Sequence, residues 1–216
     1  MAIVIATYCS HLAVHKNLLK MKILLDNGHG IDTPGKRSPD GLFREFAYNR
    51  YIASQIHQRL KSNGLDSQLL VPEMEDISLA ERCRRTNQIC RQLGSDQVLL
   101  ISIHVNAAGN GSEWMNARGW SCYTTPGQTR ADELATCLYR AATEHLYGHK
   151  IRMDYTDGDP DIESSFYILR HTLCPAVLTE NLFMDNKEDV AFLESREGVA
   201  AIIQLHIDGI LKYTFQ

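Results

Sequence analysis

The chain contains neither a long apolar run nor a closely spaced cysteine pair. A helix that crosses a membrane needs about 18 or more consecutive apolar residues, and no such run occurs in the 216 residues, so no transmembrane segment is expected. The six cysteines are scattered, without a Cys-x-x-Cys pair, which argues against a structural zinc site and against a disulfide framework. We therefore expect free thiols in a protein made in a reducing compartment.

The sequence also lacks internal repeats, low-complexity linkers and a strong excess of charge. A formal net charge of -4 and a pI near 6.1 give no electrostatic reason for binding nucleic acid or an anionic membrane surface. A hydrophobic content of 44% in a chain of this length is enough for one full core. We expect a single domain without a nucleic-acid partner.

The first 20 residues differ from the rest of the chain. They contain an apolar patch, but neither the positively charged start nor the small-residue cleavage site of a secretory signal peptide. Met21 directly precedes the first convincing strand. We interpret residues 1–20 as an N-terminal appendage of unknown role and residues 21–216 as one compact domain.

Strand and helix signals alternate from residue 22 onward. Apolar runs predict strands at 23–25, 69–71, 98–105, 119–123 and 176–179. Amphipathic periodicity and capping residues predict helices at 46–63, 78–94, 129–147 and 195–213, and the polar segment 149–165 is expected to be a loop. The alternation predicts an α/β fold: a single domain with a mostly parallel twisted sheet of about six strands and helices on both faces.

Three of the apolar runs end on a side chain that can bind a metal or transfer a proton. These side chains are His29, His104 and Glu180. In an open α/β sheet, ligands bind outside the carboxyl ends of the strands, so three such endings are expected to meet in one site. The convergence favours a catalytic zinc.

Each histidine alone has a plainer explanation. His29 could be a loop histidine between turn glycines, and His104 could be a hydrogen-bonded core residue; only their pairing favours a metal. Catalytic zinc usually takes three protein ligands, and the residues alone leave the third ligand open among the acids and the other histidines. Glu45 opens the first long helix and faces the same edge, although a first-turn acid often only favours the helix dipole.

Other metal-like spacings are weaker. His145 and His149 lie four residues apart but lack the glutamate that follows the first histidine of a helical zinc motif. His11 and His15 have the same spacing within the N-terminal appendage. The aspartates of segment 154–161 lack the spacing and the terminal glutamate of an EF-hand. We expect no metal at these positions.

Several motifs, in order and in register, resemble one known family. They are Asp26-Asn27-Gly28-His29-Gly30, Glu45 ahead of Asn49, Ser102-Ile103-His104-Val105-Asn106, Phe166-Tyr167-Ile168-Leu169-Arg170 and Ala176-Val177-Leu178-Thr179-Glu180-Asn181. Over roughly residues 22–213 the chain is similar to the zinc-dependent N-acetylmuramoyl-L-alanine amidases of the amidase_3 type. Family members usually have proline where this chain has Asn27 and an aliphatic residue where it has Thr179; neither position is a ligand.

The resemblance implies one zinc ion per chain, held by His29, Glu45 and His104, with Glu180 as the catalytic carboxylate. It implies hydrolysis of the amide bond between N-acetylmuramic acid and the L-alanine of the peptidoglycan stem peptide. Zinc lowers the pKa of bound water to about 7 and polarises the scissile carbonyl, while a second carboxylate takes the proton of the water and hands it to the leaving amine.

The same motifs offer Asn106, Arg170 and Asn181 as candidate substrate-binding residues. Segment 107–118 is short where regulated relatives carry a long inhibitory insertion, so no activator protein is expected. The protein is expected to be made in the cytoplasm and to act on the cell wall after release or export. Phage lysis and host wall turnover are both open, as is the oligomeric state.

Two other function classes remain as alternatives. Another zinc peptidase or amidase acting on cell-wall peptides would use the same chemistry, but the chain contains no peptidase metal motif. A catalytically inactive peptidoglycan-binding module would have no need of Glu180.

Overall fold

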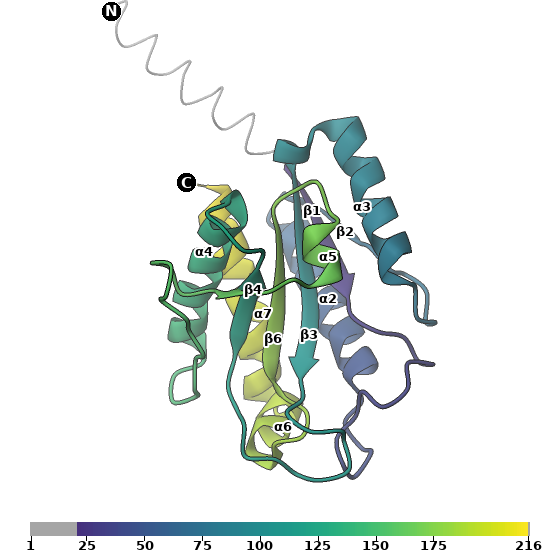
Figure 1. Cartoon of the computed structure of the whole chain (residues 1–216), viewed down its shortest axis with the longest axis vertical. Helices are drawn as coiled ribbons and strands as arrows, with labels where there is room; N and C mark the ends of the chain where they lie inside the picture. Colours follow the sequence, from purple (N-terminus) through teal and green to yellow (C-terminus); the bar gives the residue numbers. More distant parts are fainter. Residues whose placement is uncertain (1–20, 216) are drawn as a thin grey trace, which may run out of the picture.

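The computed structural model describes residues 21–215, in which six strands form one sheet with helices on both faces (Figure 1). The strands are β1 (Lys22–Asn27), β2 (Asp66–Leu69), β3 (Val98–Asn106), β4 (Ser121–Thr124), β5 (Ile162–Glu163) and β6 (Ala176–Phe183). Their order across the sheet is β2-β1-β3-β6-β4-β5, and only β4 and β6 pair antiparallel. The predicted α/β fold with a mostly parallel sheet is confirmed. The predicted appendage, residues 1–20, lies outside the described residues.

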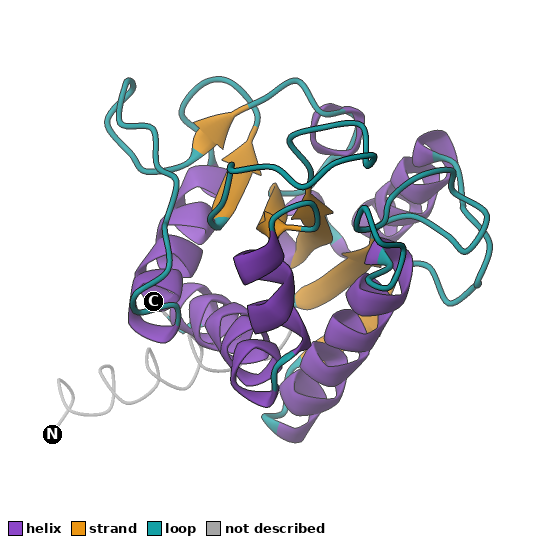
Figure 2. Ribbon diagram, turned by 90° about the horizontal axis from the view of Figure 1, so that it is seen from below, coloured by secondary structure: helices purple, strands orange, loops and turns teal. Residues whose placement is uncertain are grey.

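Different helices cover the two faces of the sheet (Figure 2). The helices are α2 (Glu45–Ser62), α3 (Leu79–Leu93), the 3-10 turn η1 (Ser95–Gln97), α4 (Arg130–His145), α5 (Tyr167–Arg170), α6 (Lys187–Glu194) and α7 (Arg196–Thr214). Helices α2, α4 and α7 pack on one face, and α3 with the short α5 packs on the other. Among residues 21–215, no helix combines the length and the apolar character needed to cross a membrane.

Side chains along the central strands alternate between the two faces of the sheet, and each face contributes to a different hydrophobic core. In β3, Leu99 and Ile101 belong to the core under α2, α4 and α7, whereas Val98 and Leu100 belong to the core under α3 and α5. All four are buried, which is typical of a parallel strand covered on both sides. The central strands are therefore fixed in register from both faces, and their carboxyl ends form a rigid edge.

The structure differs from the sequence prediction mainly at short elements. Strand β2 ends at Leu69 instead of spanning 69–71, because this edge strand alternates polar and buried positions and Pro72 follows the apolar pair. Helices α5 and α6 were not predicted, and segment 149–165, predicted as a loop, contains β5. Strand β6 continues to Phe183, so Glu180 lies within the strand and not at its end.

Helices α4 and α7 approach each other closely at Gly209. A Cβ atom at this position would lie 2.9 Å from the Cα of Leu138 and 2.7 Å from its Cδ2. We expect Gly209→Ala to lower the free energy of unfolding by about 1–3 kcal/mol, because α4 must move away to make room. Urea unfolding measures this, with the exposed Lys212→Ala on the same helix as a control that changes stability by less than about 0.5 kcal/mol. Equal stability of the two variants would contradict the close packing.

Candidate metal centre and active site

Two imidazoles and one carboxylate meet at the carboxyl edge of the central strands. His29 follows β1, Glu45 opens α2 and His104 lies near the end of β3. One ligand atom from each lies within 4.8 Å of the others, and no other group of this kind occurs in the described part of the chain. His104 Nδ1 is 3.1 Å from Glu45 Oε1, and His29 Nε2 is 3.4 Å from Glu45 Oε2. The structure thus brings the three predicted ligands together.

The carboxylate of Glu45 is buried, with only 1% of the residue exposed. Its Oε1 accepts the backbone N–H of Val105 at 3.0 Å, but its Oε2 is buried without a hydrogen-bond partner. An ionised oxygen without a partner is expensive to bury, unless a cation lies beside it. Two imidazoles with one carboxylate are also a recurring ligand set of catalytic zinc. The residues present therefore fit a zinc ion.

The ionisation states of His29 and Glu45 suit metal binding. Burial lowers the pKa of His29 to about 4, although the charge of Glu45 acts to raise it, so this imidazole is neutral at pH 7. Burial acts to raise the pKa of Glu45, but the hydrogen bond and charge of His104 and the charge of His29 bring it below its ordinary value. A neutral imidazole and an ionised carboxylate are the forms that bind a metal.

Glu180 lies beside this cluster on the neighbouring strand. It is the ladder partner of His104 between the parallel strands β3 and β6, so the two side chains project from the same face of the sheet. Its Oε2 is buried without a hydrogen-bond partner. Desolvation raises the pKa of Glu180 to about 7, with the charge of His104 opposing and that of Glu45 adding to the rise. A carboxyl group with this pKa can accept and donate a proton near neutral pH.

Left-handed backbone conformations gather around the cluster. Among residues 21–215, the non-glycine residues with positive φ are His29 at 65°, Lys36 at 47° and Leu182 at 65°. The carbonyl of Lys36 accepts the N–H of Glu45 at 3.0 Å, and Leu182 lies in the irregular register between β3 and β6. Such conformations cost about 1–3 kcal/mol each and persist where the surroundings hold them, often at functional sites.

The three predicted substrate-binding residues lie in different surroundings. Asn106 ends β3, is partly exposed, and accepts the N–H of Ala107 with its side chain at 2.8 Å. Arg170 lies on α5 and borders a separate hollow with Ala176 at the amino end of β6, so the structure does not bring it to the cluster. Asn181 is fully buried: it accepts the indole N–H of Trp120 and donates to the carbonyl of His104, both at 2.9 Å. Its amide braces β3 and is not free for substrate.

The weaker metal-like spacings have other partners. His145 pairs with Asp208 at 2.7 Å, and the ring of His149 lies tilted against that of Phe192 with ring centroids 3.8 Å apart. Asp161 accepts the hydroxyl of Thr124. His11 and His15 lie outside the described residues.

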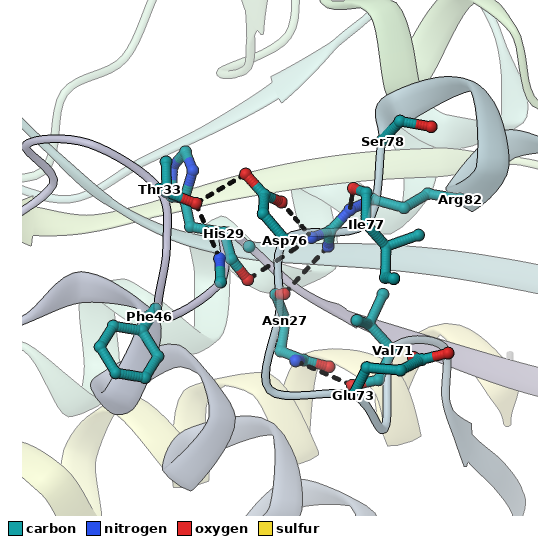
Figure 3. A network of polar contacts seen from close by, with 12 residues as sticks. Asn27, His29, Thr33, Phe46, Val71, Glu73, Asp76, Ile77, Ser78 and Arg82 are labelled. Atoms are coloured by element: carbon teal, nitrogen blue, oxygen red, sulfur yellow. Dashed lines mark hydrogen bonds and ion pairs between the residues drawn. The ribbon is translucent and has the colours of Figure 1, made fainter.

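A polar network behind the cluster was not predicted from the sequence (Figure 3). Arg82 on α3 is buried; it pairs with Asp26 at 2.6 Å and with Asp76 at 3.0 Å, and donates to the carbonyl of Asn27 at 3.0 Å. Asp26 also accepts the hydroxyl of Ser102 at 2.6 Å. The available signal was an arginine on the inward face of the 78–94 helix, between the buried positions of its apolar stripe.

A hollow opens beside the two imidazoles and on the same side as this network. It is bordered by His29 and His104 on one wall and by the segment 76–79 at the start of α3 on the other. Ile77 and Leu79 make part of this second wall apolar. His29 and His104 thus border this hollow, whereas Glu45 on α2 does not.

Comparison with known proteins found a matching family and several relatives. The model of the Amidase_3 family, described as N-acetylmuramoyl-L-alanine amidase, matches residues 23–212. The chain is 29% identical over 195 residues to the N-acetylmuramoyl-L-alanine amidase CwlM of Bacillus licheniformis, covering 89% of this chain and 68% of the relative. It is equally 29% identical to the endolysin of Bacillus phage SPP1, covering 87% of this chain and 64% of the relative. The chain thus spans about two thirds of these relatives.

Solved structures show the same fold. The crystal structure of an N-acetylmuramoyl-L-alanine amidase from Clostridium difficile 630 superposes with a TM-score of 0.73 at 25% identity, covering 89% of this chain and 96% of the other. The amidase AmiC2 of Nostoc punctiforme gives a TM-score of 0.74 at 24% identity, covering 91% and 98%. The second likeness shows the fold alone.

Gly28 leaves the space that the ring of His104 occupies. A Cβ atom there would lie 2.2 Å from Cε1 of His104 and 2.5 Å from both ring nitrogens. We expect Gly28→Ala to displace this ring and to weaken zinc binding by about 10-fold or more. Competition with a chromophoric chelator measures the affinity, and Gly209→Ala, which crowds Leu138 instead of His104, is the control for a general loss of stability. Zinc binding as tight as in the wild type would show that the position of the ring is unimportant.

Proposed function

The chain belongs to the N-acetylmuramoyl-L-alanine amidase family, and on that premise we propose that it works with one zinc ion held by His29, Glu45 and His104. Family membership makes the protein a peptidoglycan hydrolase of this class. The observation that carries the zinc proposal is the convergence of three ligand atoms within 4.8 Å around a buried, unpartnered carboxylate oxygen. When bound, such an ion supplies Lewis-acid polarisation of the substrate carbonyl and makes water a better nucleophile.

Glu180 is proposed as the proton-transferring carboxylate. Its carboxyl takes the proton of the attacking water and returns it to the amine that leaves when the amide bond breaks. Two features support this role: it is the ladder partner of His104, and desolvation places its pKa at about 7. An ordinary exposed glutamate would be too weak a base for the first transfer, and a strongly basic group would not return the proton.

The remaining residues of the site are proposed to orient the substrate or to close the back of the metal cluster. Asn106 is the candidate substrate contact that the structure leaves partly exposed beside His104. Helix α2 closes the back of the cluster through Glu45, so the substrate amide is expected to approach from the hollow at segment 76–79.

We further propose that the protein acts on the cell wall, because peptidoglycan is its proposed substrate. One relative is named as an N-acetylmuramoyl-L-alanine amidase and another as the endolysin of a phage. Peptidoglycan is the proposed substrate in both settings, and the site geometry is compatible with lysis as well as with wall turnover.

Two alternatives predict different observations. A zinc peptidase acting on wall peptides would cut between amino acids and leave the lactyl amide intact. An inactive binding module would have no use for a carboxyl held beside His104 with a raised pKa.

Replacing Glu180 separates metal binding from catalysis. Glu180→Gln keeps the shape of the side chain but cannot accept the proton, so we expect kcat on purified peptidoglycan to fall by about 10²- to 10⁴-fold. Elemental analysis should still find about one zinc per chain, as expected for three intact ligands. Glu133→Gln, an exposed change of the same kind on α4, is the control. A variant at position 180 with near-normal kcat would remove the proposed role.

The products of digestion identify the bond that is cut. We expect mass spectrometry of digested sacculi to find free stem peptides with intact L-alanine amino termini, together with glycan strands that carry no peptide. Treatment with a strong chelator should abolish the release, and added zinc should restore it, because the metal supplies the polarisation of the carbonyl. Shortened stem peptides would indicate a peptidase, and undiminished release by enzyme free of metal would overturn the zinc proposal.

A further inference from the structure

Three successive backbone carbonyls next to the metal centre are each held by a side chain from a helix. The carbonyl of residue 27 accepts from Arg82 at 3.0 Å, and that of residue 28 accepts from Asn49 at 3.3 Å. The carbonyl of residue 29 accepts from Arg50 at 2.8 Å and from Arg82 at 3.5 Å. Figure 3 shows Arg82 reaching the loop from α3. We call Asn49, Arg50 and Arg82 the carbonyl clamp.

The clamp acts on a residue whose backbone is strained. His29 has a φ of 65°, in the left-handed region that residues with a Cβ rarely adopt. Histidine adopts this conformation more readily than most residues with a Cβ, but it remains uncommon, so we infer that tertiary contacts hold it. The carbonyl of residue 29 belongs to the peptide plane that follows the Cα atom of His29. Holding this carbonyl therefore restricts the backbone angles of His29 and, with them, the direction of its imidazole.

The clamp is built at some electrostatic cost. Burial lowers the pKa of Arg50, and the positive charge of Arg82 lowers it further. Two cations thus converge on one carbonyl, and the ion pairs of Arg82 with Asp26 and Asp76 offset their repulsion. Arg50 also donates to the carbonyl of Glu73 at 2.8 Å through Nη2, which uses both arms of its planar guanidinium.

Helix α2 connects the clamp to the ligand set. Within its first two turns it carries Glu45, Asn49 and Arg50, and Asn49 also donates to Glu45 Oε1 at 3.4 Å. One rigid helix therefore sets the carboxylate ligand and the loop that bears His29. The distance between these two ligands is fixed before any ion binds.

We propose that Arg50 is a positioning residue that preorganises His29 for the metal, working with Asn49 and Arg82. This inference rests on the proposed zinc function and adds a requirement to it. Supporting groups of this kind typically change metal affinity by about 10- to 100-fold. Arg50 is the member to test, because it is only partly buried and its hydrogen bonds go to backbone carbonyls, whereas removing Arg82 would leave Asp26 as an uncompensated buried charge.

The experiment compares Arg50→Ala and Arg50→Lys with Arg59→Ala. Arg59 lies on the exposed side of the same helix, where its side chain donates to Gln204 at 3.3 Å. Zinc affinity is measured by competition with a chromophoric chelator, and the visible absorption of the Co²⁺-loaded protein reports the ligand geometry. We expect Arg50→Ala to weaken zinc binding about 10- to 100-fold and to shift the Co²⁺ bands.

The other variants give graded expectations. The zinc affinity of Arg50→Lys should lie between those of the wild type and Arg50→Ala. An ammonium group can reach one carbonyl, but it cannot donate to two in the way that the planar guanidinium does. Arg59→Ala should bind zinc within twofold of the wild type. Ile56→Val, a buried change on the same helix, should lower the melting temperature but leave zinc affinity and the Co²⁺ spectrum unchanged.

Three outcomes would decide against the inference or its premise. Unchanged zinc affinity and spectrum in Arg50→Ala would overturn the clamp. Equal weakening in Ile56→Val would reduce the role of Arg50 to general stability of α2, and so would also overturn it. If Arg50→Ala does not fold, Arg50→Lys decides by the same criteria. A wild-type protein without zinc affinity would instead refute the proposed function.

Discussion

The burial of one carboxylate, that of Glu45, is the constraint on which the site depends. A carboxylate with 1% of its residue exposed must be compensated, and here a backbone N–H and two imidazoles surround it. Its negative charge raises the pKa of His104 against the effect of burial and works in the same direction on His29. A cation placed between these groups would satisfy the oxygen that has no hydrogen-bond partner. The proposed metal would therefore also stabilise the fold at this edge.

The alternation of side chains along a strand explains why neighbouring residues lie on opposite faces of the sheet and make different contacts. His104 and Glu180 are ladder partners and project from the face that α3 covers, where Asp26 and Ser102 also lie. Asn181, one position further, projects toward the opposite core and binds Trp120. A shift of the register by one residue would exchange these roles, so the apolar residues that fix the register of β3 and β6 also fix the chemistry of the site.

Features that follow from hydrophobic periodicity and from the ends of strands could be predicted from the sequence. Features that follow from packing between distant segments could not. The pairing of His29 with His104 was predictable because both follow apolar runs of a parallel sheet, whereas Glu45 needed the family resemblance. The misplacement of β2 came from an edge strand whose alternating polar residues hide its pairing. Arg82 was not identified because its buried partners lie far away in the chain, 55 residues for Asn27 and 56 for Asp26. The burial of Asn181 was not foreseen, because a motif does not reveal which face of the sheet a residue occupies.

The irregularity in β6 completes the wall of the site. Between His104 and Asn106 the register jumps, so that β6 places an additional residue opposite β3 and Leu182 adopts its left-handed conformation. A bulge of this kind bends the strand locally and redirects the chain beyond it. The continuation carries Asp185, which is buried and accepts the N–H groups of Ala108 and Gly109 at 2.8 and 2.7 Å. The loop that follows β3 is thus anchored by the segment that continues from β6, which links the segments that bear His104 and Glu180 through hydrogen bonds as well as through register.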